Sequence, residues 1–187
     1  MVAELPVARD ERSRGIGIAE LPDRLSGARV IIIDGRSGSG KTQLADRLAE
    51  RFGARVVHMD DLYAGWDGLG AGQRYLVETI ITPLLQGRAA RWQSWNWATD
   101  RRDRWHRIEP VERLIIEGCG SLTSQTLPLA QATVWLEAPE VVRRARARRR
   151  DGDDWWWEQW AGQELEHLRA NHPESLAALL VDTDLAP

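Results

Sequence analysis

The residues best suited to chemistry form a glycine- and serine-rich stretch that contains the only lysine of the chain. An apolar run at residues 30–33 and Asp34 lead into Gly35-Arg36-Ser37-Gly38-Ser39-Gly40-Lys41-Thr42. Glycines in such a loop let successive backbone N–H groups turn inward and bind phosphate oxygens, while the lysine reaches the terminal phosphates and the Thr hydroxyl binds Mg²⁺. We therefore predict a phosphate-binding loop (P-loop) whose nucleotide contacts are Ser37, Gly38, Ser39, Gly40, Lys41, Thr42 and Gln43.

The residues around this loop favour a P-loop over the alternative, a glycine-serine turn that matches the motif by accident. Residues 43–52 carry apolar side chains at helical spacing, and Gly53 follows as a C-cap. The N-terminus of that helix would place the positive end of its dipole behind a bound phosphate. A guanine-specific GTPase is excluded because its Asn-Lys-x-Asp motif needs a second lysine. The predicted nucleotide is ATP, bound with Mg²⁺.

Composition limits the remaining possibilities. A chain of 187 residues with 43% hydrophobic residues can bury a full core, and its one cysteine, Cys119, excludes an intramolecular disulfide and a cysteine-rich zinc site. The first residues do not resemble a signal peptide, and no apolar run approaches membrane-spanning length. We expect a cytoplasmic protein without a membrane partner. A net charge of −3 argues against nucleic acid as the main partner.

Strand-like and helix-like segments alternate along the chain. The helices are expected to start near Lys41, Gln73, Glu140 and Asp154, and the strands occupy residues 29–33, 55–58, 114–117, 133–136 and 179–182. This alternation predicts an α/β P-loop NTPase fold, in which a five-stranded parallel sheet carries helices on both faces. We expect a single domain over residues 1–187, with an N-terminal extension, residues 1–28, formed by a short helix and a loop.

Acidic residues follow two of these predicted strands. Asp60 comes soon after the second strand, and Glu117 ends the third. Ligands of such sheets bind at the carboxyl ends of the strands, where a carboxylate can hold Mg²⁺ or accept a proton from an attacking hydroxyl. The alternatives are a helix N-cap for Asp60 or Asp61 and a surface acid for Glu117.

An arginine-rich segment at residues 143–150 would place Arg143, Arg146 and Arg150 on one face of a helix. Arginines this dense repel one another unless an anion binds them. A phosphoryl group in transfer is such an anion, so we predict a small arginine-rich lid over residues 143–154. A solvated basic helix and a nucleic-acid patch are the alternatives.

The order of these motifs resembles the uridine kinase and phosphoribulokinase-like branch of P-loop kinases. Met59-Asp60-Asp61-Leu62-Tyr63 is similar to the family's Q-D-S-F-Y, and Arg143-x-x-Arg146-x-x-x-Arg150-Asp151 to its lid motif R-x-x-R-x-x-x-R-D. The resemblance implies that Asp60 is the base and a magnesium partner, that Tyr63 contacts the substrate, and that Glu117, in Ile115-Ile116-Glu117-Gly118, lies near the metal. It also implies that Arg143 contacts the substrate and the moving phosphoryl group.

Two further motifs concern the acceptor. Trp66-Asp67 resembles a Phe-Asp pair, which implies that Asp67 holds ribose hydroxyls. Residues 95–100 resemble Y-D-Y-x-x-H, the stretch that binds the pyrimidine, but Trp95 replaces its tyrosine and Asp100 its histidine. An aromatic face is kept, whereas an acid accepts hydrogen bonds where an imidazole could donate one.

The sequence therefore predicts a kinase that uses Mg-ATP and a small-molecule hydroxyl acceptor, a nucleoside first, with no nucleic-acid partner. A sugar or polyol kinase, an ATP-binding switch protein and a nucleic-acid-handling ATPase are the alternatives, and the oligomeric state stays open. Ten tryptophans are unusual for this length. Trp92, Trp97 and Trp105 either narrow the acceptor pocket or pack the sheet edge. The run Trp155-Trp156-Trp157 lies before a helix whose Trp157, Trp160, Glu164 and Leu168 form one stripe.

Overall fold

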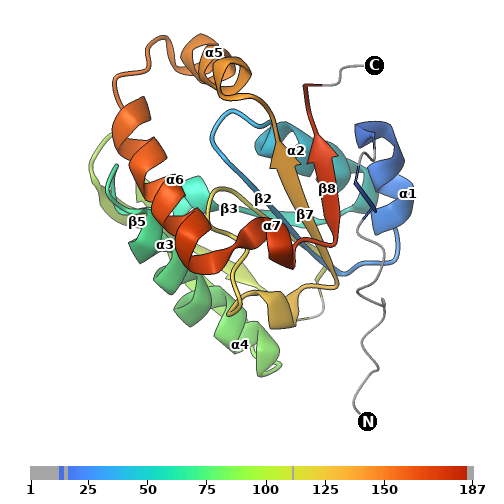
Figure 1. Ribbon diagram of the computed structural model, residues 1–187. Coiled ribbons are helices and arrows are strands. Elements are labelled where there is room, and N and C mark those ends of the chain that lie inside the picture. The colour runs from blue at the N-terminus through green and yellow to red at the C-terminus, as the bar shows by residue number, and fades with distance from the viewer. Residues whose placement is uncertain (1–12, 15–16, 111, 185–187) are drawn as a thin grey trace.

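The computed structural model describes residues 13–14, 17–110 and 112–184, and its centre is a parallel sheet (Figure 1). The strand order is β1-β8-β7-β2-β6-β3, and every neighbouring pair is parallel. The strands are β1 (Ser13–Arg14), β2 (Val30–Gly35), β3 (Arg55–His58), β6 (Leu114–Glu117), β7 (Ala132–Glu137) and β8 (Leu179–Asp182). The five predicted strands are confirmed, and β1 adds a two-residue edge next to β8.

Helices cover both faces of the sheet, as expected for this alternating sequence. They are α1 (Leu21–Leu25), α2 (Lys41–Phe52), α3 (Leu69–Leu76), α4 (Thr82–Leu85), α5 (Glu140–Asp151), α6 (Trp157–Asn171) and α7 (Pro173–Leu176). The side chains of β2 alternate between the two faces: Ile31 and Ile33 pack with α1 and α2, and Ile32 packs with α3, α4 and α6. The fold is therefore the predicted α/β P-loop NTPase fold.

Turns and caps fix where these elements begin and end. Gly53 ends α2 with φ of 63°, as predicted for a C-cap. A π-helical turn (Val77–Ile81) joins α3 to α4, where Pro83 lacks the N–H that a regular ladder needs. Short 3₁₀ turns occupy Ile18–Glu20, Met59–Asp61 and Leu127–Leu129. None of the helices in the described part of the chain is both long and apolar enough to cross a membrane.

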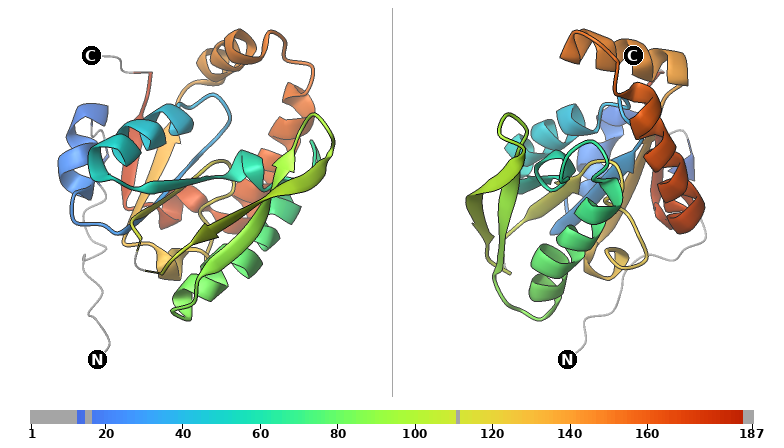
Figure 2. Two further views of the ribbon diagram at one scale, coloured as in Figure 1. Left: turned by 180° about the vertical axis from the view of Figure 1, so that it is seen from behind. Right: turned by 90° about the vertical axis from the view of Figure 1, so that its left-hand side faces the viewer.

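An antiparallel hairpin of β4 (Ala90–Asn96) and β5 (Arg101–Ile108), which was not predicted from the sequence, lies beside the parallel sheet (Figure 2). Its inner face buries Ala90, Trp92 and Ile108 in the core. In the turn, Oδ1 of Asn96 accepts hydrogen bonds from the N–H groups of residues 98 and 99 (3.0 and 3.2 Å). Asp100 completes the turn with a left-handed φ of 52°. The stretch expected to bind the acceptor base is therefore a strand end and its turn.

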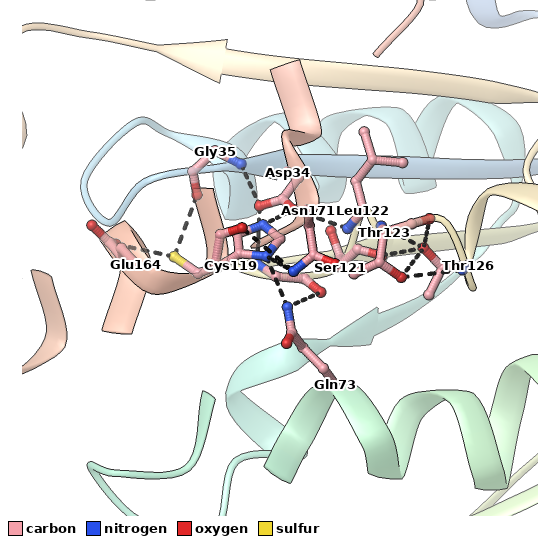
Figure 3. Close-up of polar contacts among 12 residues, drawn as sticks. Asp34, Gly35, Gln73, Cys119, Ser121, Leu122, Thr123, Thr126, Glu164 and Asn171 are labelled. Atoms are coloured by element: carbon pink, nitrogen blue, oxygen red, sulfur yellow. Dashed lines mark hydrogen bonds and ion pairs between the residues drawn. The ribbon is translucent and has the colours of Figure 1, made fainter. Parts of the chain in front are cut away.

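A buried polar network fastens the end of β2 to the elements around it (Figure 3). Oδ1 of Asp34 accepts from the N–H groups of Gly35 (2.7 Å) and Gly120 (3.1 Å). Oδ2 accepts from the N–H of Leu122 (2.9 Å) and faces Nε2 of His167 on α6 (3.1 Å). A buried carboxylate is tolerated when its oxygens are satisfied in this way. Asp34 thereby joins the start of the P-loop to α6 and to the loop after β6.

We predict that Asp34→Asn lowers the free energy of unfolding by about 3 kcal/mol, because an amide NH₂ would face backbone N–H donors that need an acceptor. Urea unfolding followed by circular dichroism measures the change. Asp46→Asn on the exposed side of α2 is the matched control and should change it by less than about 0.5 kcal/mol. Equal effects of the two variants would contradict the structural role of Asp34.

Candidate active site

A cavity of about 950 Å³ lies at the carboxyl ends of the central strands. Its lining comes from the P-loop, the turn after β3, the end of β6, helix α5 and the start of α6. Figure 1 shows α5 above the ends of β7 and β8, at the same edge of the sheet. Parallel sheets bind their ligands at this edge, so the cavity is the candidate active site.

The P-loop has the backbone shape that a phosphate cradle requires. Gly38 and Gly40 have left-handed φ values of 79° and 96°, and α2 begins directly afterwards at Lys41. A Cβ atom at Gly38 would lie 2.2 Å from the carbonyl oxygen of Arg143, so only glycine fits there. The first N–H groups of α2 have no intrahelical acceptor. The loop can therefore offer them to an anion, and Ser37, Ser39, Thr42 and Gln43 also line the cavity.

Lys41 lies on the floor of this cradle, with only 7% of its surface exposed. Its Nζ donates to the carbonyl oxygen of Arg36 (3.1 Å) and contacts Sγ of Cys119 (3.6 Å). Burial by itself would lower the pKa of Lys41, but the negative charges of Glu117, Glu164 and Asp34 raise the pKa above its usual value. The amine therefore stays protonated, as phosphate binding requires.

Glu117 ends β6 beside Thr42, with 2% of its surface exposed. Its Oε1 accepts from Oγ1 of Thr42 (3.2 Å) and faces Nδ1 of His58 (2.7 Å). The hydrogen bond to Glu117 is the main cause that raises the pKa of His58. Oε2 is buried and has no hydrogen-bond partner within the described residues. An orphaned carboxylate oxygen next to a hydroxyl fits a magnesium ion.

The described residues hold no cluster of three or more His, Cys, Asp or Glu side chains around one point. A magnesium site in phosphoryl-transfer proteins needs only one or two carboxylates, which act together with phosphate oxygens and water. The predicted metal ligands Thr42 and Glu117 are thus brought together, and Asp60 lines the same cavity.

Asp60 lies in the short turn after β3 and opens into the cavity. Its side chain does not cap the turn, whose N-cap residue is His58. Asp60 is exposed within the cavity, but the protein atoms around it reduce the hydration of its carboxyl and so raise the pKa of Asp60, and the negative charge of Glu117 raises it further. A carboxylate with a raised pKa accepts a proton more readily, which suits a general base.

Tyr63 lines the cavity, but its hydroxyl is already used. It donates to the carbonyl oxygen of Cys119 at 2.6 Å, and burial raises the pKa of Tyr63 well above its usual value. The side chain is almost completely buried. Tyr63 can therefore shape the acceptor pocket with its ring, whereas its hydroxyl serves the fold.

The three lid arginines do not share one role. Arg143 is buried and donates from Nε to Ala138 (3.0 Å) and from Nη1 to the carbonyl oxygen of Ser37 (3.1 Å). It supports the P-loop from outside the cavity. Arg146 lines the cavity while it holds the carbonyl oxygen of Thr183 (2.9 Å), and Arg150 lines it while paired with Asp151.

Besides Arg143, three residues expected to bind the acceptor do not line the cavity. Asp67 accepts a hydrogen bond from Gln159 at 2.6 Å, and Asp100 lies in the hairpin turn. The ring of Trp95 packs near the guanidinium of Arg102, 5.9 Å away. The cavity is instead lined by five other tryptophans: Trp66, Trp97, Trp155, Trp156 and Trp160. The sequence shows that tryptophan is unusually frequent, but it does not show that these five line one cavity.

Glu164 of α6 is a site residue whose role the sequence did not reveal. Its Oε1 accepts from the N–H of Ser37 (2.6 Å), and Oε2 pairs with Nε of Arg36 (2.9 Å). The Sγ of Cys119 lies 3.3 Å from Oε1, and burial raises the pKa of that thiol to about 12, so it is neutral. The only signal was an acid in an otherwise apolar helical stripe. Glu164 holds the P-loop from behind.

The fold is that of small-molecule P-loop kinases of known structure. A protein described as a possible uridine kinase from Bacillus stearothermophilus has 19% identity and a TM-score of 0.65, over 88% of this chain and 97% of that one. A sugar kinase from Janibacter sp. has 17% identity and a TM-score of 0.52, over 86% and 88%. Shikimate kinase from Acinetobacter baumannii has 16% identity and a TM-score of 0.51, over 88% and 89%.

These likenesses show the fold. No family model matches the sequence, and no curated protein sequence matches it significantly.

We predict that Glu164→Gln weakens ATP binding at least about ten-fold, because the neutral amide loses the ion pair with Arg36 and a charge-assisted acceptor for Ser37. Isothermal titration calorimetry with a non-hydrolysable ATP analogue measures the affinity. Glu166→Gln on the exposed side of α6 is the control. Unchanged affinity in a folded Glu164→Gln variant would show that the P-loop keeps its shape without this carboxylate.

Proposed function

We propose that this protein is an ATP-dependent kinase that transfers the γ-phosphoryl group of Mg-ATP to a hydroxyl of a small molecule. The observation that carries the proposal is that Lys41, Glu117 and Asp60 line one cavity, although they follow three different strands. The cavity also continues beyond the P-loop into a second, aromatic part, which leaves room for an acceptor beside a nucleotide. A cytoplasmic location agrees with a substrate such as ATP.

The residues of the chain divide the work of this reaction. Mg²⁺ would be held by Thr42 and by the carboxylates of Glu117 and Asp60, and it would neutralise phosphate charge. Asp60 takes the proton of the acceptor hydroxyl while the oxygen of that hydroxyl bonds to the γ-phosphorus. The bond from the γ-phosphorus to the β–γ bridging oxygen breaks at the same time, and ADP is released. Lys41 and Arg146, with Arg150, neutralise the charge on the moving group. Arg143 contributes through the shape of the P-loop.

A nucleoside is the first candidate acceptor. The motif order of the sequence supports it, as does a fold shared with a protein described as a possible uridine kinase. A sugar or polyol is the second candidate, since a sugar kinase and shikimate kinase share the fold. Because Asp67 and Asp100 lie outside the cavity lining, the hydroxyl and base contacts implied by the resemblance do not decide between them.

We predict that Lys41→Ala lowers acceptor-dependent ADP release at least about a thousand-fold, because the phosphates lose the charge that positions and stabilises them in transfer. The assay measures ADP from Mg-ATP with nucleosides, sugars and polyols as acceptors. Arg51→Ala, an exposed cation at the end of the same helix, is the control. Full activity in a folded Lys41→Ala variant would refute the proposal, and slow hydrolysis unaffected by any acceptor would favour an ATP-binding switch.

Asp60→Asn should reduce kcat at least about a hundred-fold and weaken Mg-ATP binding much less, because the base is lost whereas Thr42 and Glu117 still hold Mg²⁺. In the unmodified enzyme, kcat/KM should fall as the pH drops through the pKa that Asp60 has in the free enzyme, which lies above the usual value of about 3.9. Steady-state kinetics across pH and calorimetry measure both quantities. The adjacent Asp61→Asn is the control. Equal losses of kcat and ATP affinity would make Asp60 a structural residue.

A further inference from the structure

Five tryptophans meet in the part of the cavity beyond the P-loop. They come from the loop after β3 (Trp66), the hairpin turn (Trp97), the segment before α6 (Trp155 and Trp156) and α6 itself (Trp160). Trp66 is the centre of the cluster, with ring centroids 5.0 Å from Trp97, 5.2 Å from Trp155 and 5.2 Å from Trp156. We call this cluster of five the tryptophan pocket.

Two members of the tryptophan pocket remain open to solvent. Trp156 and Trp160 are buried, whereas Trp97 is 40% and Trp155 is 65% exposed. These two indoles belong to distant parts of the chain, yet both contact Trp66 and both line the cavity. Exposed aromatic surface that lines a concave site is typical of a place where a ligand binds.

Trp97 also connects the pocket to the reaction centre. Its Nε1 donates to the backbone carbonyl oxygen of Asp60 at 2.9 Å. A ring that lies against Trp97 is therefore next to the residue that carries the proposed base. An acceptor whose hydroxyl is attached to such a ring, directly or through a sugar, would enter the site with that hydroxyl near Asp60.

Charged side chains also line this end, among them Asp153 and Arg150, whose guanidinium lies 6.0 Å from the ring of Trp156 and is paired with Asp151, but uncharged polar side chains are few. Among the described lining residues, the neutral hydrogen-bonding side chains other than Tyr63 and the indoles are Ser37, Ser39, Thr42, Gln43 and Thr183, which lie in or beside the P-loop. The hydroxyl of Tyr63 is used by Cys119. A polyol placed against the faces of the indoles would lose hydration that those faces cannot replace, while a flat ring would gain stacking.

We infer that the tryptophan pocket binds a flat aromatic ring of the acceptor by its faces, through Trp97 and Trp155, and does not read the polar edges of that ring. This inference rests on the proposed kinase function. It selects ring-bearing alcohols over plain sugars and polyols, and it makes the enzyme tolerant of which ring is attached. Such tolerance follows because stacking needs only a π-face, whereas discrimination needs hydrogen bonds to the edge.

Three acceptors with the same ribose hydroxyls test whether the tryptophan pocket stacks on the ring without recognising its polar edges. Uridine and cytidine differ at the ring edge, and 1-phenylribose (a phenyl C-riboside) has a ring without polar edges. The expected kcat/KM values for these three agree within about five-fold, and ribose and ribitol fall at least about thirty-fold below them. If ribose or ribitol matches uridine, or if uridine exceeds 1-phenylribose by a hundred-fold, the stacking inference is overturned while the kinase stands.

Substitutions of single tryptophans test whether Trp155 is a residue on which the acceptor ring stacks. Trp155→Leu should raise the KM of uridine and of 1-phenylribose about ten-fold, with the KM of ATP unchanged, and Trp155→Phe should restore most of the loss. Trp105→Leu is the matched control, because Trp105 is 62% exposed on the hairpin and does not line the cavity. Equal behaviour of Trp155→Leu and Trp105→Leu would overturn the assignment of Trp155.

Calorimetry separates the inference from the proposed function. If no acceptor stimulates ADP release, the kinase proposal fails, and 1-phenylribose is titrated into the full-length protein with and without a non-hydrolysable ATP analogue. Binding that Trp155→Leu weakens and Trp105→Leu leaves intact would support the tryptophan pocket as a ring-binding site by itself. Absence of binding to the unmodified protein would overturn it.

Discussion

Two buried carboxylates behind the P-loop, Asp34 and Glu164, are the constraint on which the rest of the site depends. Asp34 accepts hydrogen bonds from three backbone N–H groups and faces His167 (Figure 3). Glu164 accepts from the N–H of Ser37 and pairs with the guanidinium of Arg36. A charge buried in this way persists only if every partner stays in place. The P-loop is therefore held in one shape by α6 and by the loop after β6, before any phosphate arrives.

The same helix connects the two halves of the cavity. Two side chains on one face of α6 support the nucleotide half: Glu164 contacts the P-loop, and His167 contacts Asp34 directly before it. One turn earlier on the same helix, Trp160 lines the aromatic half of the cavity. The hairpin approaches from the other side and attaches to the turn of Asp60 through Trp97. Nucleotide and acceptor contacts are thus supported by shared elements, so a change in the position of α6 would affect both.

The features predicted correctly are those that depend on short stretches of sequence. The strands at residues 55–58, 114–117 and 179–182 have the predicted ends, because short β-branched and apolar runs between turn residues define a buried strand. The hairpin was missed because its strands are rich in arginine and tryptophan and poor in aliphatic residues, and because the motif resemblance indicated an acceptor-binding stretch at residues 95–100. Arg143 matched the lid motif, yet helix geometry alone could not say that its side chain turns toward Ser37 and away from the cavity.

The parallel sheet, the P-loop and the strand ends that bring Lys41, Glu117 and Asp60 to one edge of that sheet could be predicted from the sequence, since they depend on the period of apolar residues and on the spacing within a motif. Only the tertiary structure decided which tryptophans meet around Trp66 and which charged residues are already paired. Trp97 and Trp155 are far apart in the chain, and no local pattern encodes their distance to a common neighbour. Side-chain burial and partner choice are settled by packing between elements, after each element has formed.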